Sequence, residues 1–490
     1  MKKLIRAVAA SFVIVGLFAS CATTSGVETE AAEKTQTQEK KKTVSKTKKQ
    51  KFDQEAYNAA FDAGDYDTCL AMLNDKSGKK EERSAVRNEL DADMLIFLSQ
   101  DYTGAGKAFL DTYYQMQQLS SSMTVGDVMK ASLSNENSVT YSGAEYERYL
   151  VWSMRLSSAL NSNQPDVANG IMKDYVGTFM DEIQALRQKN KEIAEESAKK
   201  MQSDEFANAQ KNLAGKGANF SFGEKPKISG KTTYENSPFF NYLGTVAYAV
   251  NDDFDHAEQF ASTYSVSNVK DVINVPSGKG HLEVVALSGV IGKRSDAGEG
   301  VDPVGIHFAI NGTVVPLYGK VAYPVFKPQE HLINNVRVTL SDGNWATAIL
   351  IEDFDEAVKI DVNQKAPGAF SRSVFRNIVK NSAAVASVVA ADAALQNAKG
   401  NALTQAAAKI AFSVAVDAAA KAVIGAEKAD IRQGELFPHK ASAAGFSVAP
   451  GTYTVKVDYY HDNAIVDSKT IENVLVKQGK VSVAVSQCTK

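Results

Sequence analysis

The residues of this chain that could take part in chemistry are its histidines and two short acidic segments. The six histidines are scattered through the second half of the chain, at His256, His281, His307, His331, His439 and His461. His256 lies in the acidic segment NDDFDHAE (251–258), and paired carboxylates recur in IEDFDE (351–356). Imidazole and carboxylate groups can bind a metal ion or transfer protons. Both segments open a predicted helix, however, so the favoured interpretation is capping of the helix N-terminus.

The usual catalytic motifs are absent from the sequence. There is no HExxH motif, no cysteine spacing typical of a metal site and no GxSxG nucleophile turn. GTVVPLYGKV (312–321) lacks the spacing of a phosphate loop, and GEGVDPVG (298–305) lacks the strand–turn–helix context of a dinucleotide site. We therefore predict no catalytic residues, no metal and no cofactor, and a protein that is not an enzyme. A hydrolase acting on the cell wall would require Glu352, Asp355 and the histidines to converge.

The first 21 residues, MKKLIRAVAASFVIVGLFASC, carry a different kind of chemistry. Lys2, Lys3 and Arg6 precede an uncharged apolar run that is too short to span a membrane comfortably, which is typical of a secretion signal. The small residues before Cys21 resemble the lipobox of bacterial lipoproteins. That resemblance implies removal of a signal peptide (1–20), a thioether between the Cys21 thiol and diacylglycerol, and acylation, with palmitate for example, of the new N-terminus.

Charge divides the rest of the chain into a basic tether and an acidic body. Residues 21–51 hold eight lysines and four glutamates without aromatics, which predicts a flexible tether. The tether lysines could lie on anionic lipid head groups, although a solvated linker is the favoured interpretation. The remaining body has a net charge of about -10, which argues against nucleic-acid binding. We expect Cys69 to be a small core residue and Cys488, near the C-terminus, to be an exposed thiol.

Residues 52–267 have few prolines and apolar residues at three- and four-residue spacing, which predicts a helical domain. An aromatic residue followed three positions later by a small one recurs near predicted turns. The pairs are Tyr66 and Cys69, Tyr102 and Ala105, and Phe254 and Ala257, with Pro165 and Ala168 as an imperfect fourth. The pattern resembles tetratricopeptide repeats, in which the aromatic fills the gap between paired helices. Packing of helical hairpins without a binding role would explain it equally well. The segment 171–213 is predicted to form one long helix.

Residues 268–490 show the alternation and turn dipeptides of strands, which predict a β-sandwich-like domain. In its last part Tyr453, Val455, Val457 and Tyr459 are expected to point inward. Helices are expected to interrupt the strands over about 353–428, first at 353–362 and then as an Ala-rich hairpin from about 368 that turns at Gly400 and Asn401. The predicted fold class is therefore α+β, with a tetratricopeptide-like domain followed by a β domain that carries a helical hairpin.

The C-terminal half contains four segments in a characteristic order: AYPVFKPQ (322–329), DFDEAVKIDVNQKAPGAFSRSVFRNIVK (353–380), ADIRQGELFPHK (429–440) and APGTYTVKV (449–457). Together with the lipobox and the predicted helical domain (52–267), these segments resemble a family of uncharacterised bacterial lipoproteins with tetratricopeptide-like repeats. The resemblance implies no known enzyme activity. It places Asp430 and Arg432 on the connection from the hairpin to the final strands. These two residues are interpreted as a structural ion pair, with a functional pair as the alternative.

Together these features predict a lipid-anchored cell-envelope scaffold or adaptor that binds partner proteins through its helical-repeat domain. Its partners would be membrane lipid, through acylated Cys21, and an unidentified envelope protein or peptide. The resemblance links the family with envelope or cell-wall biogenesis. Ala22 after the Cys resembles the sorting signal of outer-membrane lipoproteins, so the outer membrane is expected rather than the inner membrane. The alternative is a lipoprotein that binds a small ligand or glycan in a cleft lined by Tyr234, Phe239, Phe240 and Tyr242.

Overall fold

The computed structural model describes residues 52–74, 85–218, 220–222, 224–302, 304–310, 313–396 and 427–490. The fold is a mixture of helices and small sheets, which confirms the α+β class. The helices of the first part are α2 (Gln54–Asp62), α3 (Tyr66–Asn74), α4 (Ala85–Leu98), α5 (Tyr102–Ser122), α6 (Val125–Ser134), α7 (Glu145–Asn161), α8 (Pro165–Asp174), α9 (Met180–Lys200), α10 (Asp204–Ala214), α11 (Pro238–Val250), α12 (Phe254–Thr263) and α13 (Lys270–Ile273). Short η segments at Glu136–Ser138 and Tyr175–Phe179 join some of them.

Four helical hairpins, α2/α3, α4/α5, α7/α8 and α11/α12, share one turn geometry. Two residues before each second helix the backbone is left-handed, at Gly64 (φ 75°), Gln100 (67°), Asn163 (52°) and Asp252 (62°). Each second helix then begins with the residue that the pattern singled out, at Tyr66, Tyr102, Pro165 and Phe254. The small residues that follow three positions later, at Cys69, Ala105, Ala168 and Ala257, have no exposed surface. The recurring sequence pattern therefore marks a recurring turn and a close contact between paired helices.

The polar groups of these turns are satisfied within the turn. The Asp65, Asp101 and Asp253 side chains each accept a hydrogen bond from a backbone N–H in the first turn of the following helix. The Asp65 N–H also donates to the Ala60 carbonyl (2.9 Å), and the Asp253 N–H donates to the Tyr248 carbonyl (3.0 Å). Such six-to-one bonds close a helix end around a left-handed residue. The chain thus ends one helix and caps the next within four residues.

The long helix predicted for 171–213 is broken in the structure. The helical path runs from Pro165 through the π-helical turn Tyr175–Phe179 to Lys200, and α10 begins separately at Asp204. The break occurs because Ser203 adopts an extended backbone conformation (φ -75°, ψ 153°) and its hydroxyl accepts a hydrogen bond from Phe206 N–H. Serine in this position is a common N-cap, and it stops the helix although no proline or glycine is present.

In the described residues the strands form two four-stranded sheets and two two-stranded sheets. The strands are β1 (Gly280–Ser288), β2 (Lys293–Asp296), β3 (Val304–Ile310), β4 (Thr313–Gly319), β5 (Pro324–Lys327), β6 (Asn335–Leu340), β7 (Trp345–Thr347), β8 (Ile349–Asp353), β9 (Lys440–Val448), β10 (Gly451–His461), β11 (Ala464–Val476) and β12 (Val481–Cys488). The first sheet has the order β12-β1-β9-β8, with β1 and β12 parallel, and the second has the order β11-β10-β6-β7. β2 pairs with β5 and β3 pairs with β4.

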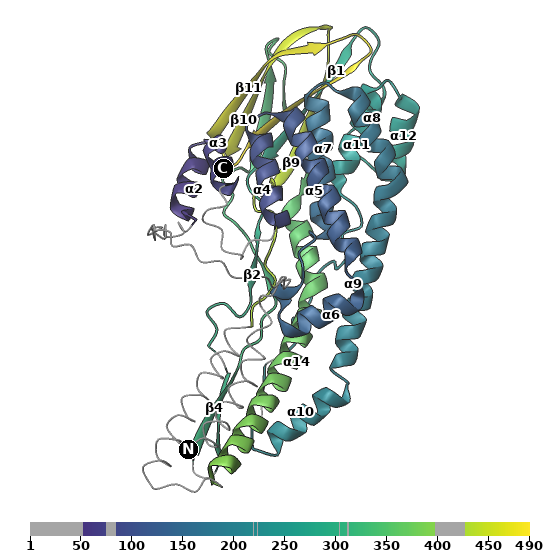
Figure 1. Cartoon of the computed structure of the whole chain (residues 1–490). Helices are drawn as coiled ribbons and strands as arrows, with labels where there is room; N and C mark the ends of the chain where they lie inside the picture. Colours follow the sequence, from purple (N-terminus) through teal and green to yellow (C-terminus); the bar gives the residue numbers. More distant parts are fainter. Residues whose placement is uncertain are drawn as a thin grey trace, which may run out of the picture.

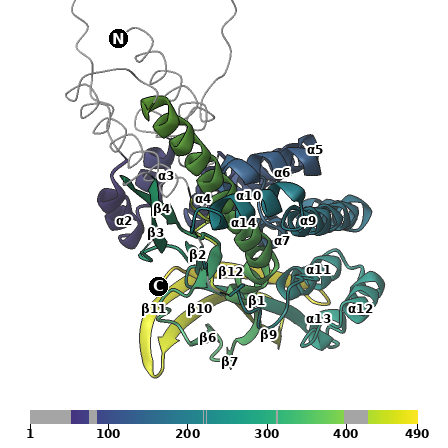
Figure 2. The same cartoon turned by 90° about the horizontal axis from the view of Figure 1, so that it is seen from below.

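The first sheet lies between the helices and the second sheet, so both of its faces are buried. Along β1, Val285 and Leu287 belong to the large core shared with the helices, whereas Val284 and Ala286 belong to the core shared with the second sheet. This two-sided burial explains the almost continuous apolar run of β1. The second core contains the residues of β10 that were expected to point inward, at Tyr453, Val455, Val457 and Tyr459. Figure 2 shows the sheets against α11 and α13 on one side.

The helix α14 (Phe354–Gln396) differs from the prediction of two separate helices at 353–362 and from 368. It runs without a break and contains Pro367. Its far part packs against α10 through Phe206, Leu213, Phe375 and Ile378, and Figure 1 shows these two helices running beside β4 away from the sheets. The predicted hairpin turn at Gly400 and Asn401 lies outside the described residues, as do the signal peptide, Cys21 and the tether.

Candidate functional site

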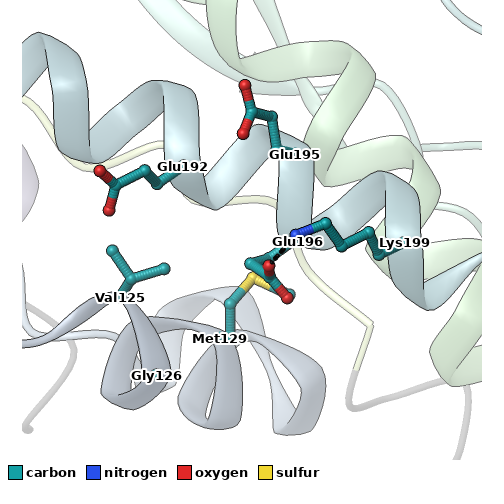
Figure 3. A pocket seen from close by; sticks show the side chains of 7 residues that line it. All are labelled: Val125, Gly126, Met129, Glu192, Glu195, Glu196 and Lys199. Carbon is teal, nitrogen blue, oxygen red and sulfur yellow. Dashed lines mark hydrogen bonds and ion pairs between the residues drawn. The ribbon is translucent and has the colours of Figure 1, made fainter.

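A groove lies between α6 and the second half of α9, with a cavity volume of about 430 Å³. Val125, Gly126 and Met129 of α6 form one wall, and the other wall is acidic, with Glu192, Glu195, Glu196 and Lys199 of α9. Figure 3 shows the Glu192 carboxylate above the Val125 side chain across the gap, and Met129 beneath Glu196. The groove therefore combines an apolar floor with negative charge along its rim.

The electrostatics of the groove follow from the spacing of α9. Glu192, Glu196 and Lys199 lie three or four residues apart, so their side chains share one helix face. Lys199 pairs with Glu196 at 2.6 Å, and this hydrogen bond raises the pKa of the lysine. Glu192 hydrogen-bonds instead to the Gln188 amide at 2.8 Å. Glu192 and Glu195 are both exposed, and the face carries a net negative charge that a cationic side chain would complement.

The two helices of the groove are held in place from both ends. Thr124 and Asp127 form a capping box that fixes the start of α6. The Lys189 ammonium of α9 donates to the carbonyl groups of Ser120 (2.7 Å) and Met123, where α5 passes into α6. Further along, the Ser197 hydroxyl contacts the Met129 sulfur at 3.6 Å and accepts a hydrogen bond from Arg372 of α14. The groove is thus part of a rigid arrangement of three helices.

The residues predicted as repeat-packing residues lie in or against the helical core and do not line the groove. Cys69, Ala105 and Ala257 are fully buried, and the aromatic rings of Tyr66, Tyr102 and Phe254 pack against the same core. Tyr66 and Tyr102 each contact a phenylalanine of the preceding helix edge-on. Cys488 is also buried, contrary to the expectation of an exposed thiol, because its side chain belongs to the core between the two four-stranded sheets. Burial raises the pKa of the Cys488 thiol to about 11.

The aromatic residues suggested as a cleft lining are core residues where the helices meet the first sheet. Tyr234, Phe239, Phe240 and Tyr242 are at most 8 % exposed. The Tyr242 hydroxyl donates to Glu283 of β1 at 2.7 Å, and the Tyr234 hydroxyl donates to Glu352 of β8. The spacing of Phe239, Phe240 and Tyr242 in α11 therefore reflects packing. The hydroxyl groups of the two tyrosines satisfy carboxylates buried in the sheet.

Glu352 links the sheet to the start of α11. Its carboxylate accepts hydrogen bonds from the Ser237 hydroxyl (2.6 Å), the Phe239 N–H (2.9 Å) and the Tyr234 hydroxyl. Burial raises the pKa of Glu352 to about 7, although these hydrogen bonds favour the ionised form. The neighbouring Asp353 is the cap predicted for the acidic segment, because it accepts a hydrogen bond from Asp355 N–H at 3.1 Å.

Asp430 and Arg432 form the predicted ion pair. The Arg432 guanidinium donates to both carboxylate oxygens of Asp430 at 2.8 Å and to the Val139 carbonyl at 2.8 Å, which ties the segment to the helical part. Burial opposes ionisation of Asp430, but the hydrogen bonds and charge of Arg432 outweigh it and lower the pKa of the carboxyl group. The pair therefore fits the structural interpretation.

The rest of the connecting segment 427–439 is held by groups that its sequence does not reveal. Gly434 N–H donates to Glu147 and Glu435 N–H donates to Asp91, two acidic residues from helices far away in the chain. Glu427 is fully buried and binds Arg376 of α14 at 2.8 Å. The opposite charges of Glu427 and Arg376 are visible in the sequence, but their separation along the chain gives no sign that they pair.

The structure separates some histidines and brings others together. His256 lies at the start of α12, where Asp253 accepts a hydrogen bond from its N–H, as the capping interpretation predicted. His281 pairs with Glu283 inside β1, at 2.9 Å. His331 and His439, by contrast, meet beside Asp355, and their ligand atoms and that of Asp355 lie within 4.8 Å of one another. Burial and the neighbouring His439 lower the pKa of His331. Sequence reasoning missed this cluster because the three residues come from separate loops and a helix end.

No family model, curated protein sequence or solved structure matches this chain. The resemblance to a lipoprotein family therefore stays a prediction from the sequence. Among the described residues, none of the helices combines the length and apolar character that a membrane crossing requires.

Proposed function

We propose that this protein is a lipid-anchored scaffold or adaptor of the bacterial cell envelope, which binds a partner protein through its helical part. The observation that carries the proposal is the groove between α6 and α9, with its apolar floor and acidic rim. Cys21, as the acylated N-terminus of a lipoprotein, would anchor the protein in the outer membrane. Residues 22–51 would be a flexible tether that lets the folded part extend away from the lipid surface.

Under this proposal the four hairpins are tetratricopeptide-like repeats and the two facing sheets are a β-sandwich-like second domain. The shared turn geometry and the buried small residues support the repeat assignment. Repeat domains commonly use their helix faces to bind extended or helical segments of other proteins. The protein would act without catalysis, by holding a partner of envelope or cell-wall biogenesis near the membrane.

The chemistry of the groove defines the partner that we propose. Val125 and Met129 provide contact for an apolar side chain, while Glu192 and Glu195 favour Lys or Arg on either side of it. The occupant is therefore a protein segment with basic residues flanking an apolar anchor. Charge complementarity of this kind mainly determines specificity and association rate, and the apolar anchor contributes most of the affinity.

A site-directed crosslinking experiment tests the proposal. A photoreactive side chain is placed at Gly126, where an added Cβ meets nothing closer than the Thr124 hydroxyl at 3.6 Å, in the full-length lipoprotein in cells. We expect a discrete crosslinked protein whose yield falls at least tenfold when Glu192 and Glu195 are both changed to Lys. Glu224→Lys, which reverses the charge of one carboxylate on an exposed loop away from the groove, should leave the yield unchanged. Absence of a crosslink, or equal loss in both variants, would contradict the groove as the binding site.

The anchor is tested separately with Cys21→Ser. We expect this variant to keep its signal peptide and to carry no acyl chains, because both processing and acylation require the thiol. A fully processed, membrane-bound Cys21→Ser protein would refute the lipoprotein assignment without bearing on the groove.

A further inference from the structure

Three segments that are remote in sequence bring two imidazoles and a carboxylate to one point. His331 lies in the loop between β5 and β6, Asp355 lies in the first turn of α14, and His439 immediately precedes β9. The side chains of Asp355 and His439 are each 7 % exposed and that of His331 is 15 % exposed. We propose that His331, Asp355 and His439 form a binding site for a divalent transition-metal ion of the zinc type.

The distances between the ligand atoms match metal coordination better than hydrogen bonding. The Asp355 Oδ2 atom lies 3.4 Å from Nε2 of His331 and 3.6 Å from Nε2 of His439. A direct N–H···O hydrogen bond has a separation of about 2.7–3.2 Å. Zinc bonds to nitrogen and oxygen of about 2.0–2.2 Å, at tetrahedral angles, place neighbouring ligand atoms about 3.4 Å apart. The two distances from Asp355 Oδ2 therefore suit one metal ion bound by all three side chains.

A backbone hydrogen bond turns the Asp355 carboxylate toward the two imidazoles. The other oxygen of Asp355 accepts a hydrogen bond from Gly292 N–H at 2.6 Å, which leaves Oδ2 turned toward the two histidines. Partners of this kind orient the ligands in metalloproteins. The two imidazole rings are stacked with centroids 3.3 Å apart and an interplanar angle of 15°. The lone pair of each imidazole nitrogen lies in its ring plane, so a rotation about the Cβ–Cγ bonds would turn both nitrogens toward one metal ion.

The backbone at Gly289 leaves room for the imidazole rings of His331 and His439. Gly289 has a left-handed conformation (φ 68°), and a Cβ on it would lie 3.0 Å from the His439 Cβ and 3.2 Å from the His331 Nδ1. The His439 backbone donates to Ser288 and accepts from Phe354, which fixes it between β1 and the start of α14. The Gln329 amide donates to the Ile291 carbonyl at 2.6 Å and holds the loop of His331. The fold thus brings the three residues together, and side-chain rotation completes the site.

The donor set suggests both the metal and its role. Two imidazole nitrogens and one carboxylate oxygen suit zinc, and three protein ligands leave a fourth position for water. Without a metal ion, Asp353 Oδ1 lies 3.2 Å from Nε2 of His439, and an ion bound to this nitrogen would replace that hydrogen bond. A bound ion would connect the loop before β6 in the second sheet, the start of β9 in the first sheet and the start of α14. It would therefore stabilise the junction of these three elements.

Zinc binding by the full-length protein in detergent tests the site. The purified protein is stripped with a chelator and titrated with Zn²⁺ by calorimetry and with Co²⁺ by visible absorption. We expect one ion per chain, the absorption bands of tetrahedral or five-coordinate Co²⁺, and a higher thermal unfolding temperature with Zn²⁺. His331→Gln and His439→Gln should each weaken binding at least about 100-fold and abolish the thermal shift.

Two further variants make the result specific. Asp355→Asn keeps an oxygen for the Gly292 N–H, so it should fold normally and still lose the metal. His256→Gln alters an exposed histidine that also contacts an aspartate, and it should bind like the parent protein. The inference is overturned if the stripped parent protein binds no Zn²⁺ at micromolar concentration, or if the three ligand variants bind it as tightly as the His256→Gln control. Neither result depends on the partner proposed for the groove.

Discussion

Replacing Glu352 by Gln should change how the stability of the protein depends on pH. The pKa of this buried carboxyl is raised from 4.5 to about 7 in the folded protein, and burial is the main cause. Because the folded pKa exceeds the unfolded one, the contribution to stability is fully present below pH 4.5 and is lost as the pH rises to about 7. The difference corresponds to about 3 kcal/mol of unfolding free energy.

The assay is chemical denaturation of the parent protein and Glu352→Gln between pH 5 and pH 8. Gln stays neutral, so the variant should gain about 2.5 kcal/mol relative to the parent over this range. Other titrating groups are common to both proteins and cancel in the difference. If the two proteins keep a constant difference in stability from pH 5 to pH 8, the reasoning about Glu352 is wrong.

Tyr234→Phe is the matched companion variant, with the opposite sign. The Tyr234 hydroxyl donates to Glu352, and a hydrogen bond to an ionised acceptor contributes more than one to a neutral acceptor. Removing it should therefore cost about 1 kcal/mol at pH 5 and about 2 kcal/mol at pH 8. An equal loss at pH 5 and pH 8 would show that the ionisation state of the carboxyl group does not change over this range, contrary to the raised pKa of Glu352.

Three further predictions concern the interior and the turns. Arg376→Met should destabilise the protein by about 3 kcal/mol or more in a denaturation assay, because Glu427 stays buried without its main partner, and adding Glu427→Gln should recover part of the loss. Gln100→Gly should raise stability by up to about 1 kcal/mol because position 100 is left-handed, whereas Asn163→Gly should change it little; equal effects would contradict the explanation. Cys69 and Cys488 are buried and their pKa values are raised, so neither should react with a thiol reagent at pH 8 until the protein is denatured; rapid labelling of the native protein would disprove this.

The local parts of this fold were predictable because their signals lie within a few residues. The pairs Tyr66 and Cys69, and Tyr102 and Ala105, mark helix starts because the turn, the cap and the packed small residue all fall within one short window. The inward orientation of alternate residues around Tyr453 was likewise predicted correctly, because one face of β10 packs in the core between the two four-stranded sheets. The break before α10 was missed because a single serine cap is a weaker signal than proline or glycine.

The long-range parts could not be predicted from one sequence. Glu352 and Asp355 lie within the same acidic segment, yet the first satisfies the start of α11 and the second faces two histidines. Their roles differ because strand alternation and the start of α14 send the side chains to different elements. Only the three-dimensional path of the chain decides which carboxylate meets which partner.

The groove and the cluster of His331, Asp355 and His439 differ in how the chain builds them. The groove is built from neighbouring turns of two helices, so its charge and apolar floor could be altered residue by residue without loss of the fold. The cluster of His331, Asp355 and His439 joins three elements that no continuous segment of chain connects. A ligand would bind the groove on the surface of a protein that is already folded. A metal ion at the cluster would instead stabilise the fold. Variants of the groove should therefore change partner binding without changing thermal stability, and variants of the cluster should change stability when zinc is present.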